Sequence, residues 1–225
     1  MPVAVTDERA ARLARLRGLY AVTSDTDDTV SLLAKCAAAL DGGASAIQIR
    51  RKSGDAPTRR AQAEAIVALC HARGALAIVN DDPALARAVG ADGVHVGEDD
   101  GGVAQARAEV GEDRLVGASC YDDPARAASA VAAGADHVAF GSFFASGTKP
   151  AARRASLDLV PRAKALGVPV VAIGGIDERN AGSLADAGVD AVAVIGALFA
   201  HDDPREVERA ARRIVAAFAR RGSGR

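Results

Sequence analysis

Short apolar runs alternate along the chain with longer segments in which alanine and leucine recur at helical spacing. Four of these runs open with one motif: a glycine, a small residue, Asp or Ser, any residue, and an apolar residue. The four copies are GASAI at 43–47, GADGV at 90–94, GADHV at 134–138 and GVDAV at 188–192. Four more apolar runs lie between them, at 18–24, 75–82, 114–120 and 168–175. The pattern predicts eight buried strands separated by helices.

Strict alternation of strands and helices predicts a parallel sheet, because parallel strands need crossover connections. Eight such units favour a single (β/α)8 barrel, the TIM-barrel fold of the α/β class. The alternative is an open doubly wound sheet, which expects a glycine-rich turn after the first strand, and the chain has none there. Helices are expected at 55–73, 83–89, 123–133, 177–187 and 203–220. We expect one domain over 1–225, with a short N-terminal helical extension at 1–17 and a frayed tail at 221–225.

Composition narrows the class of protein. A formal net charge of −1 gives no support for binding nucleic acid. No apolar run approaches the roughly 20 residues that a membrane helix requires, and residues 1–18 lack the apolar stretch of a signal peptide. Three cysteines, with no CxxC pair, favour a reduced cytoplasmic protein. Only four of the 28 basic residues are lysines, and two of them, Lys52 and Lys149, follow strands directly.

The carboxyl ends of barrel strands carry the active site in this fold, so the residues there are candidates. Alternation after the second strand places Gln48, Arg50 and Lys52 on one side, which suits a charged ligand rich in oxygen. A strand that frays into a solvated loop explains the same residues equally well.

Acidic residues follow the third and fourth strands. Asp82 precedes a proline and is expected to cap the next helix, which leaves Asn80 and Asp81 without a structural role. The loop Glu98-Asp99-Asp100 would face Asp81, and such carboxylates would repel one another unless a cation lay between them. Carboxylate oxygens suit Mg²⁺ together with substrate phosphate, whereas a solvated acidic turn is the alternative.

The fifth strand ends with Ser119 and Cys120, and no Ser-His-Asp set or activating partner for the cysteine is visible. His95 and His137 lie within strands and are interpreted as core residues or as residues behind the site. Glycine turns follow strands seven and eight, the usual phosphate site of barrels. Between these regions, the loop after strand six offers hydroxyls and one ammonium, which donate well to phosphate oxygens, at Ser146, Thr148 and Lys149.

Taken in order, seven motifs between about Gly18 and Ala200 resemble those of the thiamine phosphate synthase family. They are Gln48-x-Arg50-x-Lys52, Asn80-Asp81, Gly97-Glu98-Asp99-Asp100, Gly117-x-Ser119, Gly141 with Ser146-Gly147-Thr148-Lys149, Ile173-Gly174-Gly175-Ile176 and Val194-Ile195-Gly196. The family transfers hydroxymethylpyrimidine from its diphosphate to the nitrogen of thiazole phosphate and releases pyrophosphate. The resemblance implies this transferase activity in thiamine biosynthesis, with a pyrimidine carbocation as the intermediate.

The resemblance also implies roles for individual residues. The expected holders of the pyrimidine diphosphate are Gln48, Arg50, Lys52 and Asn80, and the expected Mg²⁺ ligands are Asp81 and Asp100, with Asp99 as the alternative to Asp100. Ser119 and Lys149 would contact the diphosphate, and the thiazole phosphate would be seated by Ser146, Thr148, Gly175, Ile195 and Gly196. The expected catalytic residues, which would stabilise the departing pyrophosphate, are Arg50, Lys52, Lys149 and Ser119.

The partners implied are small phosphorylated substrates and, because family members are often dimers, a second copy of the chain. Three other functions are alternatives to the synthase activity. A thiazole tautomerase on the same barrel would have a histidine shortly after the serine, where this chain has Tyr121. A Schiff-base aldolase would use Lys52 as nucleophile, and a non-catalytic barrel would only sense a thiamine precursor. Arg153 and Arg154 match nothing in the family pattern.

Overall fold

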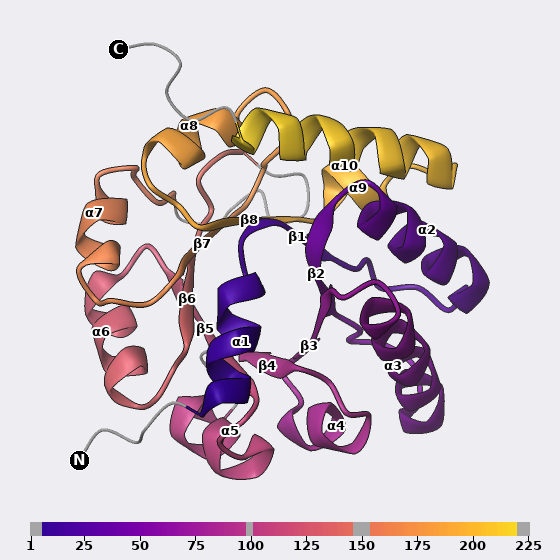
Figure 1. Cartoon of the computed structure of the whole chain (residues 1–225), viewed down its shortest axis with the longest axis horizontal. Helices are drawn as coiled ribbons and strands as arrows, with labels where there is room; N and C mark the ends of the chain where they lie inside the picture. The colour runs from indigo at the N-terminus through magenta and orange to yellow at the C-terminus, as the bar shows by residue number, and fades with distance from the viewer. Residues whose placement is uncertain (1–5, 98–100, 146–153, 220–225) are drawn as a thin grey trace.

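The computed structural model describes residues 6–97, 101–145 and 154–219. Its eight parallel strands pair in chain order and close into a barrel (Figure 1). This confirms the predicted (β/α)8 fold. The strands are β1 (Gly18–Val22), β2 (Ala44–Ile49), β3 (Leu76–Asn80), β4 (Gly93–Val96), β5 (Leu115–Tyr121), β6 (His137–Phe140), β7 (Val170–Ile173) and β8 (Ala191–Val194).

Helices surround the barrel, except for the first, which lies across one end of it (Figure 1). They are α1 (Asp7–Arg15), α2 (Thr29–Asp41), α3 (Ala56–His71), α4 (Pro83–Ala88), α5 (Gly102–Val110), α6 (Pro124–Ala132), α7 (Leu159–Lys164), α8 (Ala181–Asp186), α9 (Gly196–Phe199) and α10 (Pro204–Ala219). Within the described ranges, no helix is both long and apolar enough to cross a membrane.

The expected helical segments agree with the helices of the structure to within two residues at each end, except in two places. The expected helix at 177–187 begins only at Ala181, because the chain first forms a turn in which the Asp177 amide donates to the Asn180 side chain at 3.0 Å. In the N-terminal extension, α1 starts after Thr6, whose hydroxyl accepts a hydrogen bond from the Arg9 amide. The expected tail at 221–225 lies outside the described residues.

The repeated motif has a structural function at the start of each even-numbered strand. Its glycines all adopt positive φ, between 69° and 100°, which costs little without a Cβ. Three of its acids accept a hydrogen bond from a backbone amide of the preceding strand: Asp92 from Ala77 at 2.9 Å, Asp136 from Val116 at 2.7 Å and Asp190 from Val170 at 2.7 Å. The repeat therefore ties neighbouring strands together at the amino end of the barrel.

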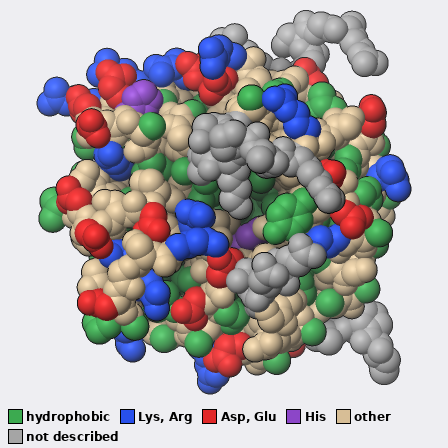
Figure 2. All heavy atoms as spheres, turned by 180° about the vertical axis from the view of Figure 1, so that it is seen from behind, with side chains coloured by type: hydrophobic (Ala, Val, Ile, Leu, Met, Phe, Trp, Pro, Cys, Tyr) green, Lys and Arg blue, Asp and Glu red, His purple; other side chains and the backbone are tan. Residues whose placement is uncertain are grey.

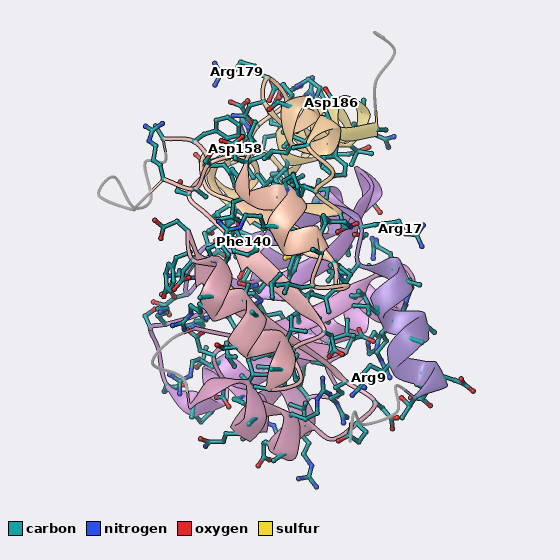
Figure 3. The ribbon with its side chains drawn as sticks, turned by 90° about the vertical axis from the view of Figure 1, so that its left-hand side faces the viewer. Arg9, Arg17, Phe140, Asp158, Arg179 and Asp186 are labelled. Atoms are coloured by element: carbon teal, nitrogen blue, oxygen red, sulfur yellow. The ribbon has the colours of Figure 1, made fainter. Side chains whose placement is uncertain are left out.

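Alternate residues of the strands enter two separate apolar clusters. One fills the space between strands and helices, and a smaller one fills the barrel interior with side chains such as Tyr20, Leu76, Ile78 and Leu115. Leu13 and Leu16, from α1 and its C-terminal end, join the interior cluster and close the amino end of the barrel. Arg9 of α1 is buried at this end (Figure 3).

Candidate active site

The carboxyl ends of the strands open on the face opposite α1, where basic and acidic side chains gather (Figure 2). Gln48 lies at the end of β2 and points into the barrel, where its amide donates to the Tyr20 hydroxyl at 3.1 Å. Both side chains are buried, and burial raises the pKa of Tyr20 well above its ordinary value. Gln48 is thus held in place at the floor of the mouth.

The loop after β2 is tied to the loop after β1. The Arg50 amide donates to the Thr23 hydroxyl at 2.9 Å, and the Lys52 amide donates to Asp25 at 3.1 Å. The Arg51 guanidinium donates to the Thr26 carbonyl at 2.8 Å. The expected alternation does not extend to Lys52: the strand ends at Ile49, and Ile49, Arg51 and Lys52 all line one pocket.

Asp81 follows β3 with a left-handed backbone, at a φ of 64°, and its amide donates to the His95 carbonyl at 2.8 Å. Positive φ is uncommon for a residue with a Cβ and is found most often at functional sites. The Asp81 carboxylate lies 3.5 Å from the Lys52 ammonium. Asp82, as expected, caps α4 by accepting from the Leu85 amide at 2.8 Å.

A pocket of about 340 Å³ adjoins the Lys52–Asp81 pair. Asn80 lines it, together with Arg51 and Arg59, so three cations and two carboxylates surround this space. The pocket therefore has the charge composition of a site for an anion that arrives with a metal ion.

The candidate metal ligands at the mouth are carboxylates. Among the residues that the structure describes, no three His, Cys, Asp or Glu side chains gather as a metal site would require. Asp81 offers a half-buried carboxylate at the mouth, which fits the oxygen preference of Mg²⁺. Asp100, the second expected ligand, and Asp99, its alternative, lie outside the described residues.

A pair of histidines lies directly behind Ser119 and forms a contact that the sequence interpretation missed. The Nε2 atom of His95 is 3.0 Å from Ser119 Oγ, and its Nδ1 atom is 3.4 Å from His137 Nε2. His95 is 5% exposed and His137 fully buried. The sequence shows a histidine in each of two strands, in GVHV and GADHV, whereas their position on either side of Gly117 of β5 comes from the strand register.

Ser119 is also held through its backbone, since its carbonyl accepts from Arg126 Nε at 2.9 Å. The Arg126 guanidinium lies 5.5 Å from the ring centre of Tyr121. The neighbouring Cys120 is buried, and burial raises its pKa to about 12. A thiol in that state is a poor nucleophile at neutral pH, so Ser119 is the polar group that β5 offers to a ligand.

The glycine turns after β7 and β8 line a second pocket, of about 380 Å³. Gly174 and Gly175 have φ values of 103° and 66°. A Cβ on Gly175 would lie 2.2 Å from the Ala145 carbonyl oxygen, so the backbone of the loop after β6 approaches here because the residue is glycine. Ile195 and Gly196 form the opposite wall, as the sequence predicted for a phosphate site.

Three expected contacts in the loop after β6, Ser146, Thr148 and Lys149, lie outside the described residues, as does Arg153. Arg154 is exposed. Arg179, which the sequence interpretation did not consider, lines the second pocket, pairs with Asp177 and points outward (Figure 3). Of the expected site residues that the structure describes, Lys52, Asn80 and Asp81 line the first pocket, and Gly175, Ile195 and Gly196 line the second. Gln48, Arg50 and Ser119 lie at or just after the carboxyl ends of their strands and line neither pocket.

Comparison with known proteins supports the same family as the motifs. A model of the thiamine monophosphate synthase family matches residues 19–198. A thiamine-phosphate synthase from Chromobacterium violaceum is 56% identical over 196 residues, which are 87% of this chain and 95% of that protein. Another, from Thiobacillus denitrificans, is 52% identical over 203 residues, which are 90% of this chain and 95% of that protein.

A solved structure agrees with the sequence relatives. The thiamine phosphate pyrophosphorylase from Pyrococcus furiosus superposes with a TM-score of 0.79 at 32% identity, and the match covers 93% of this chain and 99% of the other. The family model matches most of the chain, and both relatives are more than 50% identical to it in sequence. The chain therefore belongs to the thiamine monophosphate synthase family.

Proposed function

We propose that the protein catalyses the reaction of this family, in which the hydroxymethylpyrimidine group passes from its diphosphate to the nitrogen of thiazole phosphate, giving thiamine phosphate and pyrophosphate. The observation that carries this assignment to the site is the division of the barrel mouth into two parts. Charged and amide side chains surround one pocket, and glycine backbone lines the other. Two phosphorylated substrates need two such places.

The charged pocket is suited to the pyrimidine diphosphate. Asn80 and Lys52 line it, and the Asn80 amide can hold a substrate in one orientation. Gln48 offers a second amide inside the barrel, where it donates to Tyr20. As the carbon–oxygen bond to the diphosphate breaks, negative charge grows on the leaving group. Arg50, Lys52 and Lys149 would stabilise that charge, and the Ser119 hydroxyl would donate to it.

The glycine pocket is suited to the thiazole phosphate. Backbone amides near Gly175, Ile195 and Gly196 can approach phosphate oxygens because no Cβ stands in the way at the two glycines. Ser146 and Thr148 would add hydroxyl donors. Holding the thiazole nitrogen close to the reacting carbon converts a bimolecular step into one within a complex, which is a large part of the catalysis needed.

Mg²⁺ would be held by Asp81 and Asp100, with Asp99 as the alternative to Asp100. The position of Asp81 at the rim of the anion pocket supports this role. When bound, the ion would supply positive charge against the diphosphate oxygens. The Lys52 ammonium lies 3.5 Å from the Asp81 carboxylate. This contact keeps the positive charge of Lys52 near the leaving group.

The alternatives fit the site less well. A Schiff-base lysine needs a desolvated ammonium, whereas the Lys52 side chain is 58% exposed and faces a carboxylate. A tautomerase would use a histidine where Tyr121 stands, and the relatives named above are called synthases. The names of those relatives also disfavour a sensor without activity.

The test is the formation of thiamine phosphate from the pyrimidine diphosphate, the thiazole phosphate and Mg²⁺, with EDTA as the metal control. Asp81→Asn should lower turnover at least ~100-fold, since a metal-binding charge is lost. Asp28→Asn is the matched control, because it removes the same charge at a helix cap that lines neither pocket, and asparagine still caps a helix well. Absence of product with the wild type, or equal rates in both variants, contradicts the assignment.

We also infer that the protein works in a reducing compartment, the cytoplasm. Cys36, Cys70 and Cys120 are all buried and unpaired, which is the usual state where thiols stay reduced. We also propose a homodimer, because members of the family are often dimers. Size-exclusion chromatography with light scattering tests the dimer, and cell fractionation tests the compartment.

A further inference from the structure

The two histidines behind Ser119 form a chain that leads from the barrel core to the mouth. Strand register places His95 of β4 opposite Gly117 of β5, and Gly117 opposite His137 of β6. The two imidazoles meet across Gly117, with ring centres 5.5 Å apart. His95 then reaches Ser119 one position further along β5 on the inward face.

Gly117 is what lets this chain form. A Cβ at that position would lie 2.1 Å from His137 Nε2 and 2.5 Å from His95 Nδ1, far inside van der Waals contact. Both rings therefore occupy the space that a side chain of β5 would otherwise fill. The arrangement depends on three residues that come from three adjacent strands.

The protonation state of His137 follows from its surroundings. The ring is fully buried, with the edge of Tyr20 against it and no carboxylate in contact among the described residues. Burial lowers its pKa well below the ordinary value, and the charge that His95 can carry lowers it further. His137 is neutral at physiological pH, so its ring carries one N–H.

That hydrogen can be on either ring nitrogen, and the surroundings favour one. His137 Nδ1 has no hydrogen-bond partner among the described residues, whereas Nε2 faces His95. A buried N–H without an acceptor is rarer in proteins than a buried acceptor without a donor. The hydrogen is therefore assigned to Nε2, which donates to His95 Nδ1 at the long distance of 3.4 Å.

This assignment determines the direction of the next bond. If His95 Nδ1 accepts, a neutral His95 carries its own hydrogen on Nε2 and donates it to Ser119 Oγ. The serine oxygen then acts as acceptor toward the core. Its hydroxyl hydrogen is left to donate to a group in the mouth.

We propose that His137 is a positioning residue that fixes the tautomer of His95 and thereby holds Ser119 as a hydrogen-bond donor toward the phosphorylated substrate. The part that concerns substrate rests on the proposed function. The tautomers themselves are a property of the protein without any ligand. The two parts can therefore be tested separately.

The first measurement is the ¹⁵N spectrum of the imidazole rings in protein labelled at its four histidines, at pH 7.5 and without ligand. Spectra of His137→Gln, His71→Gln and His201→Gln assign the signals, with His95 as the remaining ring. We expect both His95 and His137 to be protonated at Nε2. Protonation of His137 at Nδ1, or a mixture of the two forms, overturns the inference whatever the enzyme activity is.

The second measurement is the affinity for inorganic pyrophosphate in the presence of Mg²⁺, by calorimetry. His137→Leu removes the donor and should weaken binding about 10-fold, the value of a hydrogen bond to a charged group. His137→Gln should retain most of the affinity, because its amide nitrogen reaches the position of Nε2 and donates there. His71→Gln, at the opposite end of the barrel beside Asp92, should bind as the wild type does.

Equal affinity in all three variants overturns the positioning role, even if the tautomers are as expected. Equal loss in His137→Leu and His137→Gln also overturns it, because packing alone then explains the effect. If His137→Leu does not fold, the comparison of His137→Gln with wild type decides, and a 10-fold loss there counts against the proposal. Failure of the wild type to form thiamine phosphate contradicts the proposed function, and the spectrum still decides the tautomers.

Discussion

Asp136 at the amino end of the barrel offers a direct measure of what the repeated motif contributes. Its carboxylate is 7% exposed, accepts from the Val116 amide at 2.7 Å and forms a short ion pair with Arg107. Arg9 of α1 lies 3.5 Å from the other oxygen, and its second partner is Glu112 at 3.0 Å. The Arg9 and Arg107 side chains are only 7% and 11% exposed. Asp136→Ala would leave two buried guanidinium groups short of a counter-charge.

The expected cost follows from that burial. Breaking a buried ion pair by removing one partner costs about 3–5 kcal/mol, because the remaining charge stays out of water. Asp190 is the matched control, since it occupies the same position in the last copy of the motif. It accepts from the Val170 amide at 2.7 Å and pairs with Lys164 at 2.8 Å. Its pair is 27% and 41% exposed, so water can replace the lost partner, and Asp190→Ala should cost about 1–2 kcal/mol.

Urea unfolding at pH 7.5, followed by circular dichroism, gives both values from the midpoints at a common slope. Asp136→Asn separates the two contributions of the carboxylate, because the amide can still accept from Val116 while the charge is lost. It should fall between the wild type and Asp136→Ala. If the losses in free energy of unfolding of Asp136→Ala and Asp190→Ala differ by less than about 1 kcal/mol, burial does not determine the contribution of the ion pair, and the reasoning fails.

Three further predictions concern other parts of the molecule. Gly175→Ala should raise the KM for thiazole phosphate about 10-fold, because its Cβ would lie 2.2 Å from a carbonyl oxygen and displace the loop. Gly188→Ala is the control, since Gly188 has a positive φ but open space around it, and it should leave the KM unchanged. Initial rates at varied thiazole phosphate measure both values. Cys70 and Cys120, whose pKa burial raises to about 12, should react with a thiol reagent at pH 8 only as fast as the protein opens, and rapid labelling of the native protein would contradict this. Because burial lowers the pKa of His137, the unfolded chain binds a proton that the folded chain does not once the pH falls below about 6.5. Between pH 6.5 and 5.5, the free energy of unfolding of the wild type should therefore fall by up to about 1.4 kcal/mol per pH unit more than that of His137→Gln, as measured by urea titration. An equal fall in both proteins would refute the buried neutral state.

The fold could be predicted because its information is local and repeated. Each copy of the motif carries a glycine for the helix end and, in three copies, an acid whose carboxylate reaches the strand before it. Eight strands alternating with helices leave few other arrangements, so the closed barrel and the family were both predicted and confirmed. The start of α8 was missed because a side-chain bond from Asn180 competes with the helix, and composition does not reveal such a bond.

The site was predictable only as far as position along a strand determines it. In a parallel barrel all carboxyl ends open on one face, so reading strand ends was enough to bring Gln48, Asp81 and Ser119 together. The contact between Lys52 and Asp81 depends on side-chain conformations across two strands, which a single sequence does not specify. His137 was interpreted as a core residue or one behind the site, because only the register of β5 and β6 shows that it meets His95.

The two ends of the barrel use polar groups in opposite ways. At the amino end, carboxylates such as Asp92 and Asp136 are satisfied by backbone amides and arginines, so nothing is left to bind a ligand. At the carboxyl end, Asp81 has a positive φ beside one pocket, and the glycine turns line another. Inside the described barrel, the histidine pair leads to Ser119 at the mouth, and the Gln48–Tyr20 bond is a second buried polar contact there. Substitution of His137 should therefore change the affinity for a ligand at Ser119, whereas substitution of Asp136 should alter only the stability of the fold.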